Sequence, residues 1–222
     1  MKSYLALALA AVVSLTACDN KIEANDKNIS LAVANYLDKK GELCLELTEW
    51  PLSISPSDME NKDVIPDALV PKMEALKALG LTAEAPGGND PNDTNPYKPE
   101  VVVKRYVLTD AGKKIYREKE VTKYDYSNKT SKKVIEGDLC YGQKKLVKVI
   151  NWTTPAKAGK WLFVNVTYAY KIDKVADWAK RPELSAAFPE IAENLAEAGK
   201  MEKKVLLKLN EQGWDEYDIG FD

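Results

Sequence analysis

The spacing of apolar residues divides the chain into segments with helical periodicity and segments with strand periodicity. In residues 28–40 (NISLAVANYLDKK), apolar side chains recur on one helical face, and Gly41 follows them. This pattern predicts a helix that ends at the glycine. Directly afterwards, Leu43, Leu45 and Leu47 alternate with less apolar neighbours, which predicts a strand.

Both patterns recur through the rest of the chain. Helices are expected over 71–79, 109–116 and 183–198, the last broken at Pro189, and strands over 101–108, 146–152, 160–172 and 205–209. The turn-rich sequence TTPAKAG, between two of these strands, predicts a hairpin. We therefore expect an α+β fold in which helices cover one face of an antiparallel sheet.

The first seventeen residues have a composition of their own. Lys2 carries one positive charge, and the 14 residues of 4–17 (YLALALAAVVSLTA) carry none. A basic tip followed by an apolar stretch and small residues is typical of a secretory signal peptide. A helix that spans a bilayer takes about 20 residues, so the stretch is too short for a permanent span. We predict that residues 1–17 are a cleaved signal peptide.

The end of this stretch, Leu15-Thr16-Ala17-Cys18, resembles the lipobox of bacterial lipoproteins. The resemblance implies that Cys18 receives a diacylglycerol thioether, that cleavage follows Ala17, and that the new amino terminus is acylated. Stable anchoring requires more than one acyl chain, and a triacylated cysteine supplies it. The alternative is an ordinary signal peptide with an incidental cysteine.

The next residue, Asp19, predicts the membrane that holds the anchor. In enteric bacteria, lipoproteins with an Asp directly after the lipidated cysteine tend to stay at the inner membrane. The resemblance therefore implies a protein on the periplasmic face of the inner membrane rather than the outer one. Residues 18–27 are expected to form a short polar tether behind the anchor.

Two cysteines, Cys44 and Cys140, remain once Cys18 is lipidated. An even pair in an oxidising compartment predicts a disulfide, and in the chain-entropy model a loop near 100 residues stabilises by about 4.7 kcal/mol. Two buried free thiols are the alternative. Without residues 1–17 the chain carries 31 basic and 34 acidic residues, a balance that argues against general nucleic-acid binding.

The first half also resembles a winged-helix domain. The segment MEALKALGL, a loop, and YVLTDAGKKIY look like the helix, the wing and the closing LT-x-x-G of that fold, over roughly residues 28–118. We expect a winged-helix-like domain over 28–120 and a second α+β domain over 121–222. The wing-like loop carries Asp90 and Asp93 but no basic residue before Lys98, whereas DNA binding needs cations against phosphate. Together with the exported address, this excludes a nucleic-acid partner.

Catalytic chemistry is restricted by the absence of histidine. The usual Ser-His-Asp and Cys-His sets and the common zinc sites require that residue, and no Ser-x-x-Lys motif occurs after residue 17. A pair of carboxylates of the glycosidase type stays open, although no acid is singled out. We expect no catalytic residues, no metal and no cofactor.

The loop 89–95 (NDPNDTN) has oxygen ligands at alternating positions, as calcium sites do. Glycine is missing at the sixth position from Asp90, and no Glu stands at the twelfth. An Asx-rich turn is therefore the preferred interpretation.

Charge and aromatic residues are unevenly distributed. Residues 98–148 carry a net charge of +7 and residues 172–222 one of −5. The basic segment faces either anionic lipid beside the anchor or solvent; solvent is preferred, because linear charge counts do not establish a spatial patch. The strand-rich part holds seven rings that line a ligand groove or pack in the core, the latter being preferred: Tyr124, Tyr126, Tyr141, Trp152, Trp161, Tyr168 and Tyr170.

These observations predict a lipid-anchored, non-enzymatic envelope protein that acts as a periplasmic binding or protein-interaction module. Its expected partners are the membrane, through the lipid anchor, and another envelope protein. A carrier of a small apolar or aromatic ligand is the first alternative. An envelope hydrolase that uses carboxylates is the second.

Overall fold

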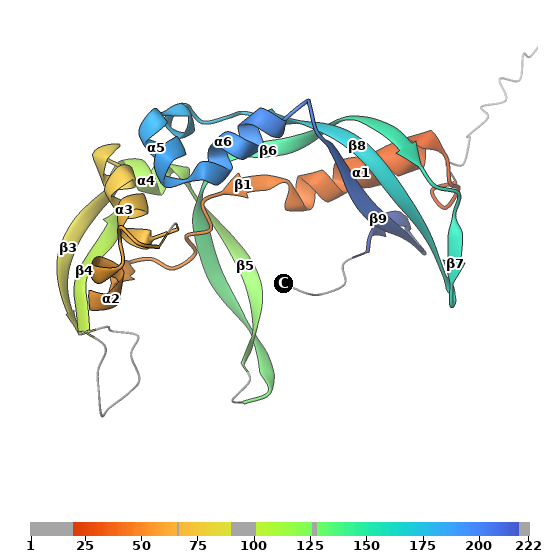
Figure 1. Cartoon of the computed structure of the whole chain (residues 1–222). Coiled ribbons are helices and arrows are strands. Elements are labelled where there is room, and N and C mark those ends of the chain that lie inside the picture. The colour runs from red at the N-terminus through yellow and green to blue at the C-terminus, as the bar shows by residue number, and fades with distance from the viewer. Residues whose placement is uncertain (1–19, 66, 90–100, 126–127, 218–222) are drawn as a thin grey trace, which may run out of the picture.

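A computed structural model describes residues 20–65, 67–89, 101–125 and 128–217 (Figure 1). Its helices are α1 (Asp26–Lys40), α2 (Pro56–Glu60), α3 (Leu69–Ala78), α4 (Asp110–Ile115), the 3-10 helix η1 (Asp177–Lys180), α5 (Pro182–Ala187) and α6 (Pro189–Glu197). Its strands are β1 (Glu42–Cys44), β2 (Leu52–Ile54), β3 (Thr82–Asn89), β4 (Val101–Leu108), β5 (Tyr116–Asp125), β6 (Thr130–Trp152), β7 (Ala156–Ala158), β8 (Trp161–Asp173), β9 (Glu202–Asn210) and β10 (Gly213–Glu216).

The larger of two antiparallel sheets is organised by the 23 residues of β6. Its strands follow the order β1-β6-β8-β9-β10, with β5 paired to β6 and β7 paired to β8. The first part of β6 pairs with β5, from Thr130 to Leu139, and the second part pairs with β1 and β8. One strand therefore belongs to two structures, a two-stranded ribbon and a sheet.

Helix α1 and the last three strands of the large sheet enclose one hydrophobic core, named core B here. It consists of Ile29, Ala32, Val33, Leu37, Val164, Val166, Tyr168, Tyr170, Val205, Leu207 and Trp214. The side chain of Asn25 accepts a hydrogen bond from the Asn28 backbone and begins the helix, as an N-cap does. At its end, a Cβ on Gly41 would lie 2.3 Å from the Leu37 carbonyl oxygen, so the chain needs a glycine there.

A second sheet, in the order β2-β4-β3, carries α2 and α3 between β2 and β3 in the chain. Glu74 of α3 joins helix to sheet, because it accepts hydrogen bonds from the Tyr106 hydroxyl and from the Lys104 ammonium of β4. The Tyr106 hydrogen bond, followed by the lysine contacts, lowers the pKa of Glu74 to about 2. The acid therefore stays ionised at neutral pH.

A second core, named core A, lies between this sheet, β1, β6 and the helices α3, α5 and α6. It consists of Leu43, Leu45, Leu47, Leu52, Ile54, Val70, Met73, Leu76, Leu81, Tyr106, Leu139, Tyr141, Ala179, Leu184, Phe188 and Ile191. These side chains come from both halves of the sequence. Core A therefore depends on contacts between segments that are far apart in the chain.

The mixed α+β architecture with antiparallel sheets confirms the predicted fold class. The helix expected over 183–198 is split at Pro189 into α5 and α6, and the expected hairpin forms where β7 pairs with β8. The strand expected from Leu43 onward ends at Cys44. Leu45 and Leu47 lie beyond the end of the strand and are nevertheless buried. Hydrogen bonds outside the regular β1–β6 pairing satisfy the backbone N–H groups of these two residues.

Two other expectations meet a different arrangement. The helix expected over 28–40 packs in core B with the C-terminal strands, while core A takes residues from both sides of position 120. The division at 120 stays a prediction, and the cores do not follow it. Residues 20–27, expected as a tether, instead form a hydrogen-bonded turn and the first residues of α1.

Within the described residues, no helix has the length and apolar character needed to cross a membrane.

Candidate functional site

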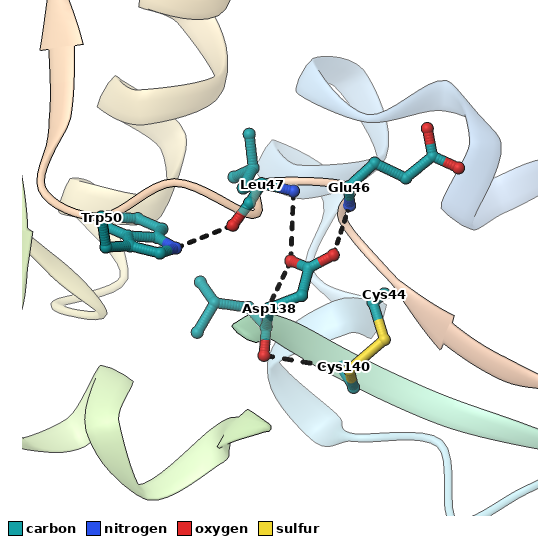
Figure 2. The surroundings of a disulfide bond; sticks show 7 residues. Cys44, Glu46, Leu47, Trp50, Asp138 and Cys140 are labelled. Atoms are coloured by element: carbon teal, nitrogen blue, oxygen red, sulfur yellow. Dashed lines mark hydrogen bonds between the residues drawn. A yellow bond between two sulfur atoms is a disulfide. The ribbon is translucent and has the colours of Figure 1, made fainter. Parts of the chain in front are cut away.

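The predicted disulfide is present. Cys44 and Cys140 are opposite each other in the β1–β6 pairing, and their sulfurs are bonded at 2.04 Å (Figure 2). The bond joins positions 96 residues apart. Glu42 lies close enough to suggest a three-ligand metal group with both sulfurs, but the sulfurs are bonded to each other and are unavailable as thiolate ligands.

Asp138, two residues before the disulfide, fixes the chain that leaves β1. Its carboxylate accepts hydrogen bonds from the backbone N–H groups of Glu46 (2.7 Å), Leu47 (3.2 Å) and Leu139 (2.7 Å) (Figure 2). Only 6% of Asp138 is exposed. Burial raises the pKa of the carboxyl, while the backbone N–H groups act in the opposite direction.

The segment after Cys44 is held in a non-strand conformation by local bonds. Glu46 has a φ of 59°, in the left-handed region that few residues other than glycine adopt. The Trp50 indole N–H donates to the Leu47 carbonyl at 2.8 Å (Figure 2). Ser55 and Asp58 then form a capping box that begins α2. Residues 45–51 are named the bridging segment, because they connect β1 to β2 of the small sheet.

A cleft of about 790 Å³ separates the bridging segment from the ribbon of β5 and β6. Glu46, Glu49 and Trp50 line one side, and the ribbon lines the other with side chains that include Lys132 and Ile135. The two walls of the cleft meet where the ribbon joins the body, because the disulfide and Asp138 hold the bridging segment at that point.

Tyr116, the first residue of β5, lines the cleft at its base, where ribbon and body meet. A Cβ on Gly137 would lie 2.3 Å from Cζ of its ring, so the ring occupies the space that the glycine leaves. Burial raises the pKa of the Tyr116 hydroxyl. The sequence therefore places a glycine where the ring must cross the ribbon.

The ribbon comprises β5 and residues 130–139 of β6, which pair without a register shift. Figure 1 shows it projecting from the body. Within the described residues, β5 has no strand partner other than β6. Ile135 and Tyr124 are 64% and 49% exposed. Among the described residues, no other strand pairs with the outer edge of β5 or with residues 130–138 of β6, while the Leu139 carbonyl accepts a hydrogen bond from the Leu45 N–H.

The ribbon carries charges of both signs. Lys123 pairs with Glu136 across the strands, and Lys133 pairs with Glu120. Alternating charges on exposed strands are one way in which natural sheets limit uncontrolled edge pairing. The ribbon is therefore adapted to solvent, and its open edges are not a defect of packing.

The predicted site residues have different outcomes. Cys18 and Asp19, Asp90 and Asp93 of the suggested calcium loop, and Tyr126 lie outside the described residues. Three of the expected rings, Tyr141, Tyr168 and Tyr170, are at most 4% exposed and pack in the two cores. Trp161 and Tyr124 are partly exposed, but they do not line the cleft.

The expected basic segment does not form a single surface of lysines without partners. Five lysines of this segment form ion pairs with acids: Lys104, Lys113, Lys123, Lys133 and Lys145. The last pair reaches Asp38 of α1, so it joins the sheet to the helix. The charges are spread over α4, the ribbon and the sheet.

Sequence reasoning overlooked Asp138 and the ribbon. Asp138 is one of 34 acids in the chain, and its partners lie 91 and 92 residues away. The available signal was the sequence DLC, which places an acid two residues before a cysteine expected to be bridged. The ribbon had no comparable signal, because its strands are polar on both faces.

Comparisons with protein-family models, with curated proteins and with solved structures give no match to this chain. The features of the molecule that bear on its function are the cleft, the ribbon and the disulfide that positions them.

Proposed function

We propose that the chain is a lipid-anchored envelope protein that acts as a non-enzymatic interaction module. The lipobox at Leu15–Cys18 supports the anchor, and Asp19 supports the periplasmic face of the inner membrane. A disulfide between Cys44 and Cys140 fits an oxidising compartment. The partner is another envelope protein, which contributes an extended segment.

The observation that carries this proposal is the ribbon, whose outer edges pair with no other strand along their length in the described part of the chain. An extended polypeptide adds to such an edge by main-chain hydrogen bonds, and pockets beside the edge select its side chains. The cleft supplies that neighbouring space, with Trp50 on one wall and Ile135 on the other. Because the disulfide and Asp138 hold the bridging segment, the cleft exists before the partner arrives, which reduces the entropic cost of binding.

Charge in the cleft indicates the composition of the partner segment. Glu46 and Glu49 line the wall opposite the ribbon, and both are exposed. Lys132 lines the ribbon side. A segment with a basic residue toward the bridging segment and an acidic residue toward Lys132 matches both walls, and such complementarity steers association and fixes register.

We also propose a winged-helix-like unit in the first half of the chain. Its support is the order β2, α2, α3, β3 and β4, with β4 between β2 and β3 in the sheet. The helix that the resemblance assigned to 28–40 packs in core B instead. The proposal therefore concerns only residues 52–108.

A photo-crosslinker placed at Ile135 in the envelope-bound protein tests the docking site. We expect one defined protein adduct, identified by mass spectrometry, because Ile135 lines the cleft. The matched control carries the crosslinker at Met201, which is 49% exposed and directly precedes β9. Equal adducts at both positions would contradict the proposal.

The same preparation tests the carrier alternative. Native mass spectrometry of the purified protein reports a bound small molecule directly. A copurifying apolar or aromatic compound, together with no protein adduct at Ile135, would replace the interaction module by a carrier.

A further inference from the structure

The residues that directly follow the proposed lipid anchor are fixed to the body of the protein. Asn28 is 9% exposed, and its side-chain amide donates to the carbonyls of Asn20 and Glu23, each at 2.9 Å. The Glu23 N–H donates to the Asn20 carbonyl at 3.0 Å. Residues 20–25 are therefore a turn bound to the start of α1.

The C-terminal strands hold the same turn from the other side. The Trp214 indole N–H donates to the Glu23 carbonyl at 3.3 Å. Gly213 has a φ of 123°, and a Cβ at this position would lie 3.0 Å from the Lys21 carbonyl oxygen. Close approach of the turn thus requires a glycine at the start of β10.

This attachment leaves little chain between the lipid and the body. Cys18 is two residues before Asn20, and two fully extended residues span at most about 7 Å. We propose that the end of the molecule formed by residues 20–26 and the neighbouring end of β6 rests on the lipid headgroups. The inference depends on the lipid attachment that the proposed function includes.

The side chains at this end suit a headgroup surface. Ile22 is 50% exposed, and Ile150 of β6 is 37% exposed. Ile150 and Lys148 line a hollow of about 480 Å³ together with Asp26 at the start of α1. Apolar side chains enter the interface, and lysines are attracted to anionic lipid. Lys21 is also exposed in the turn.

Contact at this end also orients the rest of the molecule. The start of α1 and the small sheet with α2 and α3 lie at opposite ends in Figure 1, with the ribbon between them. The lipid surface therefore covers neither the ribbon nor the cleft, and both stay available to a protein partner.

Hydroxyl-radical footprinting of lipidated protein in vesicles of phosphatidylethanolamine and phosphatidylglycerol tests the inference. Labelling of Ile22 and Ile150 is expected to be lost relative to the unlipidated Cys18→Ser protein. Ile135 of the ribbon is the matched control, and its labelling is expected to stay unchanged. A second variant carries a flexible insert of roughly twenty Gly and Ser residues after Asp19, which lengthens the tether by about 25 Å. This insert is expected to restore labelling of Ile22.

The outcomes separate this inference from the proposed anchor. A lipidated protein, verified by intact mass, in which Ile22 is labelled as strongly as in the Cys18→Ser protein would overturn the contact alone. Equal protection of Ile22 with and without the insert would show that the short tether does not cause the protection, and would also overturn the inference. An unmodified intact mass would overturn the anchor and the contact together.

Discussion

The ribbon part of β6 and the part around Leu139 and Tyr141 are both extended strand, but their environments differ. In the ribbon, Ile135 is 64% exposed, whereas Leu139, four residues later, is completely buried and Tyr141 is 1% exposed. The change occurs within one continuous strand, whose pairing to β5 extends to Leu139. Membership of one continuous strand therefore does not decide whether a segment is covered.

The difference is the presence of a second layer. Beyond Leu139, core A packs against the strand and β8 pairs with its second part, while the ribbon has β5 alone. Cys140 and Asp138 mark the boundary between the two parts. Without a second layer the faces of the ribbon stay exposed, and because no other described strand pairs with β5, the outer edge of β5 is available for a partner.

Loss of the disulfide at the boundary is expected to have the largest effect on stability. The Cys44→Ala/Cys140→Ala variant loses the constraint on a loop of 96 residues, for which the chain-entropy model gives about 4–5 kcal/mol. Urea unfolding measures the difference, with reduced wild type as the control. A free energy of unfolding within about 1 kcal/mol of the oxidised wild type would contradict the assignment of this bond as a principal constraint.

A matched pair of truncations tests the comparison directly. Leu139 and Ile135 lie on the same face of β6, since side chains alternate with period two. Leu139→Ala removes a fully buried side chain of core A, and we expect a loss of about 2–4 kcal/mol. Ile135→Ala is expected to change the free energy of unfolding by no more than about 0.5 kcal/mol. Similar losses would mean that the ribbon is covered in solution.

Asp138→Asn weakens the attachment of the bridging segment. An amide cannot accept all the hydrogen bonds that the carboxylate receives from Glu46, Leu47 and Leu139. We expect a loss of about 1–3 kcal/mol, the cost of a buried N–H without a partner. Hydrogen exchange at the Glu46 and Leu47 amides is expected to accelerate, and unchanged exchange there would contradict the role assigned to Asp138.

Asp138 also makes the free energy of unfolding depend on pH, in a definite direction. Because burial raises the pKa of Asp138 in the folded protein, the folded state binds the proton more tightly than the unfolded chain. The contribution of Asp138 to the free energy of unfolding therefore falls as pH rises from about 3.8 through the raised pKa. The difference between wild type and Asp138→Asn is expected to narrow over that window in denaturation measured at each pH.

Elements with one buried face were predictable from sequence. In α1, β8 and β9, apolar residues recur with the period of the element, because one side faces core B. In the ribbon, residues 116–125 (YREKEVTKYD) show no such alternation, since neither face is covered. Apolar periodicity in a sequence reflects burial of one face, so a strand with no buried face carries no such periodicity.

The disulfide was predictable because cysteine count and compartment do not depend on geometry. The role of Asp138 was not, because it depends on where Glu46 and Leu47 pass in space. Likewise, the polarity of residues 20–27 indicated a tether, but the amide of Asn28 and the indole of Trp214 bind their carbonyls. Polar residues that satisfy the backbone are indistinguishable in sequence from polar residues in solvent.

The smallest expected effect concerns ion pairs, which occur in both parts of β6. Glu120–Lys133 crosses the ribbon, and Asp38–Lys145 joins α1 to the covered part. All four side chains are more than 40% exposed, so each pair is expected to contribute at most about 0.5 kcal/mol in a double-mutant cycle. Equal, small coupling energies in the two pairs would leave apolar cover as the reason why the two parts of β6 contribute differently to stability. A coupling energy above about 1 kcal/mol in the Asp38–Lys145 pair alone would assign part of that difference to charge.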